Sequence, residues 1–501
     1  MIYSIKSCLS LRTWLGVFVS KKDFPKIHFY DQDFVDIYDK TWNWTASSWI
    51  DPKTNEVSKD GYFVHVNPNE PEKQVIDQFE SIFSTFFLVY SNKNYEASQN
   101  LDYFYSKQEE NGSIRWKYDL KTGKAVLDES NPEGIGIPLF AWAEFNLYHK
   151  SANKRRVKEI TPILQKYMTW IDETFKQPNG LYAAPFQSST MYNSPRDGCY
   201  YPIDFNTAMA INSLNMSSLG DILNDKELSF QFKKNYFSLK TRINNLMWDG
   251  ETGFYYDLDK DEKKLSAKTI AGFWPLLAEI PAVDKADALI AHLSNPDTFG
   301  TDHPFPTLSR DHPAFSEDGD GFKGGVFPKF NFMVIKGLEK YQRYSLAREC
   351  AIRHLYFILE ALSPADGSKG DLYESYLPCR EGVAKGKLPN GEIDPNYPKK
   401  HHIITIGLST IALMIENVIG LEISLPRKTV DWIIPNLEIM GIEKLSLKRN
   451  LITILSNKSP RGWEVQMESE KLYYFTINII DQKKKTLPIP SGKCSMLIDK
   501  L

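Results

Sequence analysis

The sequence predicts a mainly helical protein in which paired helices close into a ring, followed by a small antiparallel β appendage. Between residues 72 and 420, amphipathic helical stretches alternate with long polar connections. Proline and glycine mark most helix boundaries, as at Pro138 before LFAWAEFNLY and at Gly420 after the last helix. Beyond Gly420 the segments are short, β-branched and often alternating. Eleven or twelve helices with few strands between them favour a ring, because a bundle would have shorter connections.

We expect three parts. Residues 1–71 form an N-terminal segment that wraps the ring, and only GYFVHV (61–66) has the character of a strand there. Residues 72–420 form the helical barrel, and 421–501 form the β appendage. The helices expected within the barrel are 72–91, 96–108, 138–149, 155–176, 204–223, 227–248, 270–280, 283–293, 328–340, 345–361 and 405–418.

Long aromatic and charged connections separate these helices. They are 109–137, 177–203, 249–269, 294–327 and 362–404. Connections of this length are uncommon in a compact domain unless they build a site. Each precedes an expected helix, so in a ring all of them gather on one face. One contains the glycine-rich EDGDGFKGG (317–325), which does not lie between a strand and a helix as a phosphate-binding loop would, and we expect it to be a mobile loop.

Composition narrows the class of function. The net charge of −3, from 60 basic and 63 acidic residues, offers no basic field for nucleic acid or a membrane surface. Aromatic residues reach 13%, which fits carbohydrate binding and is also normal for a large helical protein. Five scattered cysteines without CxxC spacing argue against a disulfide framework or a zinc cluster. We expect a cytoplasmic monomer or homodimer that needs no metal and no cofactor.

Motif screening leaves carboxylates beside aromatic rings as the candidate chemistry. The sequence has no GxSxG elbow, HExxH zinc motif or Walker loop. Glu374 lies in LYESYLP between Tyr373 and Tyr376. Partial desolvation among rings raises the pKa of a carboxyl group and suits it to proton transfer near neutral pH. The alternative is a surface glutamate in a loop.

Several motifs together resemble a known family. LYESYLP is similar to the Trp/Leu-x-Glu-x-Tyr element of inverting glycosidases that include trehalases and mannosylglycerate hydrolases (glycoside hydrolase families 37 and 63 and relatives). GGVFPKFNFMVIKGLEKY (324–341), GFWPLLA (272–278) and GLSTIALMIENVIGL (407–421) resemble further elements of that family in the same order. The resemblance implies an (α/α)6 barrel (a six-hairpin toroid) whose loop-rich face binds a small carbohydrate.

The resemblance assigns a base and leaves the acid open. Inversion requires a carboxylic acid and a carboxylate base about 6.5–9.5 Å apart. The family motif implies that Glu374 is the base. The acid is the aspartate of Asp-Asn-Ser-Pro-Arg in relatives, and here MYNSPR (191–196), followed by YPIDFN, places Tyr192 in that slot.

Three explanations stay open. Tyr192 itself donates the proton, although a phenol with a pKa of about 10 is a poor acid. Asp197, close by in the chain, takes the role instead. Otherwise the protein binds a sugar without hydrolysing it, as a binding or scaffold protein, or its leaving group needs no protonation. The expected substrate is a small α-glycoside, trehalose-like or an α-glucoside.

The family motifs also imply residues that contact the sugar. Phe79 and Glu80 stand where the family has tryptophan and aspartate, and Gln108 and Arg115 resemble a second wall of that pocket. Arg196 could donate two hydrogen bonds to vicinal hydroxyls or to an acidic substituent. A structural hydrogen bond or salt bridge is the alternative for each. The complete set is Phe79, Glu80, Gln108, Arg115, Arg196, Trp274, Asn331 and Tyr376.

Overall fold

The structure is a computed structural model, and it describes the greater part of the chain. The described residues are 23–47, 49–50, 62–63, 75–189, 191–364, 367, 369–388, 390–398, 406–433, 439–447, 450–460, 462–469, 476–479, 485–488 and 492–499. Within them, no helix combines the length and the apolar character that crossing a membrane would require.

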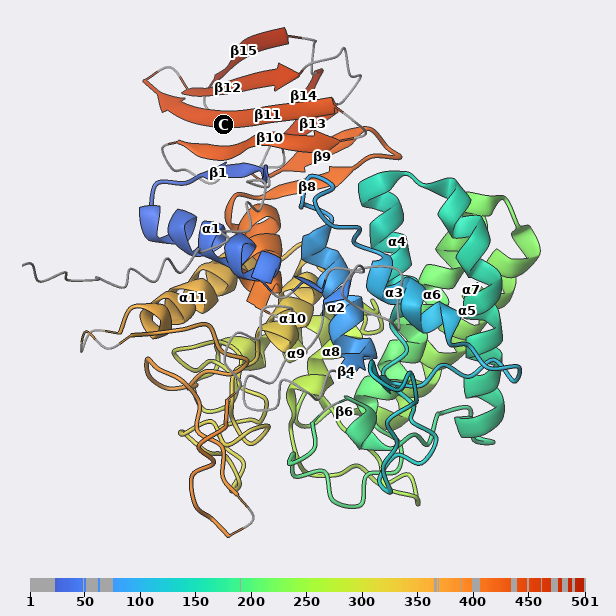
Figure 1. The fold of residues 1–501 in the computed structure, drawn as a ribbon. Helices are drawn as coiled ribbons and strands as arrows, with labels where there is room; N and C mark the ends of the chain where they lie inside the picture. The colour runs from blue at the N-terminus through green and yellow to red at the C-terminus, as the bar shows by residue number, and fades with distance from the viewer. Residues whose placement is uncertain are drawn as a thin grey trace, which may run out of the picture.

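Six helices form a closed inner ring (Figure 1). They are α2 (Gln78–Leu88), α4 (Phe140–Ser151), α6 (Ile203–Leu223), α8 (Trp274–Leu277), α10 (Pro328–Lys340) and η5 (Leu408–Val418). Each packs against the next in this order, and η5 contacts α2. Every residue of α2 and of η5 is buried, because an inner helix is surrounded by other helices on all sides.

Outer helices cover the ring. They are α1 (Gln32–Ser47), α3 (Gln99–Ser106), α5 (Lys154–Phe175), α7 (Lys226–Arg242), α9 (Val283–Ser294) and α11 (Tyr344–Leu362). Short 3-10 or π turns adjoin some elements: η2 (Phe186–Ser189), η3 (Ile243–Met247) and η4 (Ile270–Phe273). In α5, buried side chains such as Val157, Ile160 and Leu164 recur three or four residues apart and form the apolar face that an outer helix needs.

All eleven predicted helices are present, and the helix that completes the outer layer, α1, comes from outside the predicted barrel. It packs against α11 and η5, where the two ends of the ring meet. Phe34, Ile37, Tyr38 and Trp42 are buried at helical spacing along it. The first 71 residues are therefore more than a wrapping segment, because they contribute a helix to the barrel.

The five long connections lie together at the end of the barrel away from the C-terminal strands, as predicted (Figure 1). Each leads into an inner helix, so the inner helices α4, α6, α8, α10 and η5 begin at this face. Backbone hydrogen bonds join neighbouring connections, as between Tyr201 and Leu258 and between Val326 and Tyr376. The loop-rich face is thus a connected layer above the starts of the inner helices.

The C-terminal part forms two sheets above the opposite end of the barrel (Figure 1). The first sheet, in strand order, is β1 (Lys26–His28), β10 (Met440–Leu447), β11 (Asn450–Ser459), β12 (Gly462–Ser469) and β15 (Gly492–Asp499). The second is β14 (Lys485–Pro488), β13 (Thr476–Ile479), β9 (Thr429–Trp432) and β8 (Leu421–Ser424). Pairing is antiparallel as predicted, except that β13 and β9 run parallel.

Short two-stranded ladders complete the fold. They are β2 (Trp49–Ile50) with β3 (Tyr62–Phe63), β4 (Val75–Asp77) with β5 (Lys117–Asp119), and β6 (Trp248–Asp249) with β7 (Phe254–Tyr255). β3 lies within the expected strand 61–66.

Candidate active site

The candidate site lies where the inner helices begin, beneath the loop-rich face. Glu80 is in the first turn of α2, Trp274 opens α8, and Lys329 is the second residue of α10. The ring closure brings these three helix starts together although they are far apart in sequence. Glu374 and Tyr192 lie in the loops above them.

A chain of aromatic rings runs from the surface into the barrel. The Tyr192 ring meets the edge of Phe322 with ring centroids 5.2 Å apart. Phe322 and Phe330 are 6.1 Å apart, and Phe330 lies 6.2 Å from Trp274, which stacks on Phe79 at 6.5 Å. Such a wall can cover the apolar face of a pyranose.

Trp274 adds a polar group to this wall. The side chain is 1% exposed, and its Nε1 has no hydrogen-bond partner among the described residues. A buried donor is rarely left unused in a native protein. The indole N–H is therefore suited to donate to a hydroxyl of a bound molecule.

Glu80, in the first turn of α2, forms an ion pair with Lys329. Its Oε1 accepts a hydrogen bond from Lys329 Nζ at 3.1 Å, and both residues are 7% exposed. The Lys329 ammonium group also lies 5.2–5.9 Å from the ring centroids of Phe79, Phe330 and Phe327. The subsite predicted from Phe79 and Glu80 thus contains a carboxylate–ammonium pair, and the family motif did not indicate its cation.

Desolvation and nearby carboxylates raise the pKa values of two tyrosines in the loops of this face, Tyr192 and Tyr397. Partial desolvation and the negative charges of Glu374, Asp320 and Asp394 raise the pKa of Tyr192 to about 12, although the residue is 62% exposed. Burial raises the pKa of Tyr397 well above its usual value, and Glu374, Tyr192 and Asp320 add to that shift. The raised pKa makes Tyr192 a poorer proton donor near neutral pH than a free phenol.

Glu374 is half-buried in a segment that is fastened on both sides. Tyr376 exchanges two backbone hydrogen bonds of 2.9 Å with Val326. The backbone N–H of His303 donates to Pro378 O at 3.0 Å, and its Nδ1 lies 3.3 Å from Leu377 O. These contacts fix the backbone on which the predicted base is carried.

His303 belongs to a buried hydrogen-bonded chain. Its Nε2 is 2.7 Å from Nδ1 of His354, whose Nε2 is 2.8 Å from Ser409 Oγ. Burial lowers the pKa of His303 well below its ordinary value and that of His354 to about 3. Both imidazoles are therefore neutral, and one consistent arrangement passes each ring N–H along the chain from Ser409 towards Leu377.

Arg196 does not contact a substrate, in contrast to the prediction. It is fully buried, and its guanidinium donates four hydrogen bonds of 2.7–3.0 Å to Asp204 and Asp257. Burial by itself lowers the pKa of Arg196, but the two carboxylates outweigh that effect and hold the pKa well above its ordinary value. Asp204, in the first turn of α6, and Asp257 are the other two members of this structural cluster.

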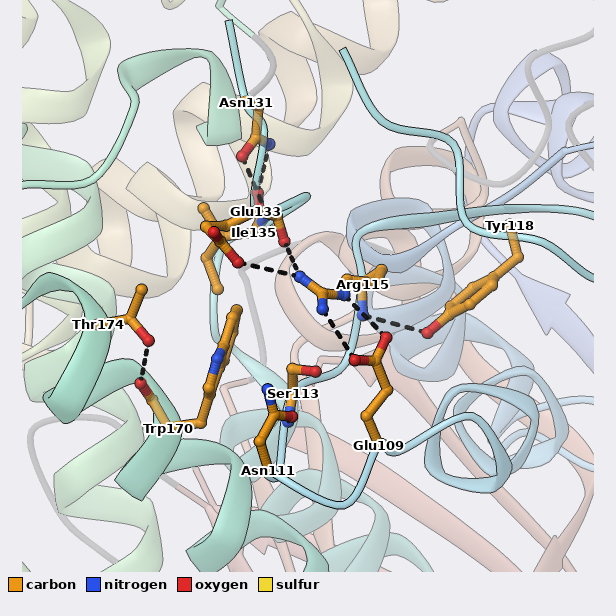
Figure 2. Close-up of polar contacts among 10 residues, drawn as sticks. All are labelled: Glu109, Asn111, Ser113, Arg115, Tyr118, Asn131, Glu133, Ile135, Trp170 and Thr174. Atoms are coloured by element: carbon orange, nitrogen blue, oxygen red, sulfur yellow. Dashed lines mark hydrogen bonds and ion pairs between the residues drawn. The ribbon is translucent and has the colours of Figure 1, made fainter. Parts of the chain in front are cut away.

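Gln108 and Arg115 also have structural contacts. Gln108 Nε2 donates to Gly112 O and to Ile163 O on the outer helix α5. Figure 2 shows Arg115 between Glu109 and Glu133, with its guanidinium 5.6 Å from the ring centroid of Trp170, also on α5. These two residues hold the 109–137 connection against the outside of the ring, so they are not a wall of the pocket.

Asn331 and Tyr376 are likewise committed to the fold. The side-chain amide of Asn331, which is fully buried, pairs with the backbone N–H and C=O of Phe305 at 3.1 and 3.4 Å. The hydroxyl of Tyr376, also fully buried, accepts from the backbone N–H of Tyr373 at 3.1 Å. Their part is to position the loops that carry other site residues.

The sequence prediction missed Asp320, which lies in the glycine-rich segment expected to be mobile, and the structure forms this segment into a hydrogen-bonded turn. Asp320 Oδ1 accepts from the backbone N–H of Lys387 at 3.0 Å, and Gly325 N–H donates to Gly321 O at 3.0 Å. The signal was the glycine on each side of Asp320, since both Gly319 and Gly321 have positive φ angles, +67° and +53°. The glycines serve a fixed turn.

A closed ring of six inner helices, with carboxylates and aromatic rings at its loop-rich end, defines a protein of the (α/α)6 glycoside-hydrolase type. The chain belongs to the mannosylglycerate hydrolase MGH1-like glycoside hydrolase domain family, whose model matches residues 92–381. Residues 420–501 match the trehalase C-terminal domain.

The chain is also similar to individual proteins and solved structures. An uncharacterized protein of Borreliella burgdorferi is 52% identical over 96% of this chain and 100% of its own length. The cytosolic neutral trehalase of Kluyveromyces lactis is 30% identical over 32% of this chain, and the match spans only 20% of that protein.

In three dimensions, the chain resembles the GH63 mannosylglycerate hydrolase of Thermus thermophilus in complex with glucose, with a TM-score of 0.57, 18% identity, and coverage of 75% of this chain and 99% of that one. It also resembles a sialidase with a TM-score of 0.67 and 15% identity, covering 88% of this chain but only 40% of that one. At these identities, the likeness establishes the fold.

Proposed function

We propose that the protein is an inverting glycoside hydrolase that acts on a small α-glycoside, trehalose-like or an α-glucoside, with Glu374 as the general base. The observation that carries this proposal is the set of carboxylates around Tyr192 and Tyr397, above a buried aromatic wall. Inversion requires two carboxyl groups, one acting as acid and one as base, on opposite faces of the sugar ring.

The surrounding residues would bind and orient the sugar. The rings of Phe79, Trp274 and Phe330 would cover its apolar face, and the Trp274 N–H would donate to a hydroxyl. The Glu80–Lys329 pair presents an acceptor and a donor side by side, which matches a hydroxyl group that both donates and accepts. Glu374 would remove a proton from the water that attacks the anomeric carbon.

The test is the isosteric variant Glu374→Gln on a panel of disaccharides and activated α-glycosides. Loss of a general base should lower kcat by about 10²–10⁴-fold. The melting temperature should hardly change, because Glu374 is only half-buried in a loop. Glu381→Gln, an exposed glutamate in the same connection, is the matched control and should keep wild-type activity. NMR of the first-formed anomer should report inversion.

A catalytically inactive sugar-binding protein is the second candidate, because a tyrosine occupies the slot of the family's acid. In that case calorimetry would detect sugar binding by the wild type, while no member of the panel would be turned over. Measurable, Glu374-dependent turnover of any member would exclude this candidate.

A further inference from the structure

The turn that carries Tyr192 is joined directly to the turn that carries Asp320. The side chain of Asn193 donates to Asp320 O at 3.1 Å and accepts from the N–H of Phe322 at 2.7 Å. Gly321 lies between these contacts, and a Cβ added to it would come within 2.7 Å of the Asn193 amide. Asp320 is therefore held beside the slot in which the family motif places its acid.

The carboxyl group of Asp320 is buried, and among the described residues only one of its oxygens accepts a hydrogen bond. The residue is 8% exposed. Its Oδ1 accepts the N–H of Lys387 at 3.0 Å, whereas Oδ2 is 3.8 Å from Nζ of Lys323, a distance too long for a hydrogen bond. One oxygen thus fixes the orientation of the group, and the other faces the Lys323 ammonium group and accepts no hydrogen bond from the described residues.

Other nearby carboxylates fit the role less well. Asp197 is exposed, and the described charges that act on Tyr192 are those of Glu374, Asp320 and Asp394. Asp204 is fully buried in its ion pair with Arg196. Asp394 acts on Tyr192, but it lies in an outer turn where its Oδ1 caps the N–H of Asn396 at 2.8 Å, and it is not among the charges acting on Tyr397.

We infer that Asp320 is the catalytic acid, in place of the carboxylate that the family motif carries at Tyr192. The inference rests on the proposed function. The proton on Oδ2 of Asp320 passes to the glycosidic oxygen as the bond from that oxygen to the anomeric carbon breaks. Water forms the new bond to the carbon and gives its proton to Glu374. Asp320 ends as a carboxylate and Glu374 as a carboxylic acid, and exchange with solvent restores both.

The decisive experiment compares Asp320→Asn on natural disaccharides and on α-glycosyl fluorides, whose leaving group needs little protonation. Asparagine keeps an acceptor for the Lys387 N–H, so the turn is preserved. We expect kcat/KM to fall about 10²–10⁴-fold on disaccharides and less than about tenfold on fluorides. Glu374→Gln should lower both, and Asp197→Asn and the exposed control Glu381→Gln should lower neither substantially.

Each outcome has a distinct meaning. Equal losses of Asp320→Asn on both substrates, with Glu374→Gln inactive, would overturn the role of Asp320 while leaving the proposed function in place. The leaving-group signature in Asp197→Asn or Asp394→Asn would transfer the role to that residue. No turnover of either substrate class by the wild type would overturn both the proposed function and this inference.

Discussion

Two arginines, each paired with two acidic residues, allow a test of how burial determines the contribution of an ion pair to the free energy of unfolding. Arg196 and Asp204 are fully buried, and Asp257 is 3% exposed. The side chain of Arg115 is 14% exposed, and its partners Glu109 and Glu133 are 46% and 49% exposed (Figure 2). The chemistry is the same at both sites, and mainly the surroundings differ.

Arg196→Met would leave two carboxylates buried without a cation. Breaking a buried pair costs about 3–5 kcal/mol, because the remaining carboxylates are desolvated and no longer have a cation to compensate their charge. Arg115→Met would cost about 0–1 kcal/mol for exposed pairs, with about 0.5–1 kcal/mol more for the lost contact with Trp170. The expected difference in the free energy of unfolding is therefore at least about 1 kcal/mol.

Urea unfolding followed by tryptophan fluorescence would measure both variants, at low salt and in 1 M NaCl. Salt should shrink the Arg115 effect and leave the Arg196 effect nearly unchanged, because buried pairs are screened little. Equal losses for the two variants, or equal sensitivity to salt, would refute the reasoning from burial.

Three further predictions concern other parts of the structure. The depressed pKa of His354 means that its contribution to stability is complete above the unfolded value near 6.5 and is lost as pH falls towards 3. Unfolding free energy should thus drop by about 2 kcal/mol between pH 7 and pH 5 because of this residue, and His354→Gln should flatten that dependence in urea titrations. An unchanged pH dependence would contradict a neutral buried imidazole. Gly321→Ala should lower kcat/KM, since the new Cβ would meet Asn193, whereas Gly391→Ala, also at positive φ but with nothing within 4 Å, should not. Similar effects of the two alanines would show that backbone conformation alone matters. Lys329→Met should weaken sugar binding about tenfold or more in calorimetry, because a buried charged hydrogen-bonding group is lost beside Glu80. An unaltered Kd would remove the pair from the binding site.

Periodicity was sufficient for the helices but not for the closure of the ring. Each predicted helix has an apolar face at helical spacing, and local pattern determines such a face. The same pattern is present in α1, with Phe34, Ile37 and Trp42 buried, but it lies beyond the boundary set at residue 72. Local sequence does not show that this face packs against α11 and η5, more than 300 residues away.

The sequence motifs indicate which segments form the candidate site, but not which of their side chains are open to a ligand. Motif order predicts roles for Glu374, Phe79, Glu80 and Trp274, and the structure brings Phe79 and Trp274 into contact, with the Glu80–Lys329 pair beside Phe79. Motif order could not distinguish a side chain that faces the pocket from one held in the wall, and so misassigned Arg196, whose partner Asp257 is 61 residues away in the chain. Residue type alone does not report burial or partners.

The attachment of the N-terminal elements α1 and β1 to elements late in the chain has a consequence for folding. α1 packs beside η5, and β1 pairs with β10, so two closing contacts join the first described residues to segments beyond residue 400. Such long-range contacts carry a large loop-closure entropy and form slowly. During synthesis, the apolar face of α1 must wait until nearly the whole chain has emerged. This interval, rather than any weakness of the finished barrel, is when the protein is most exposed to aggregation.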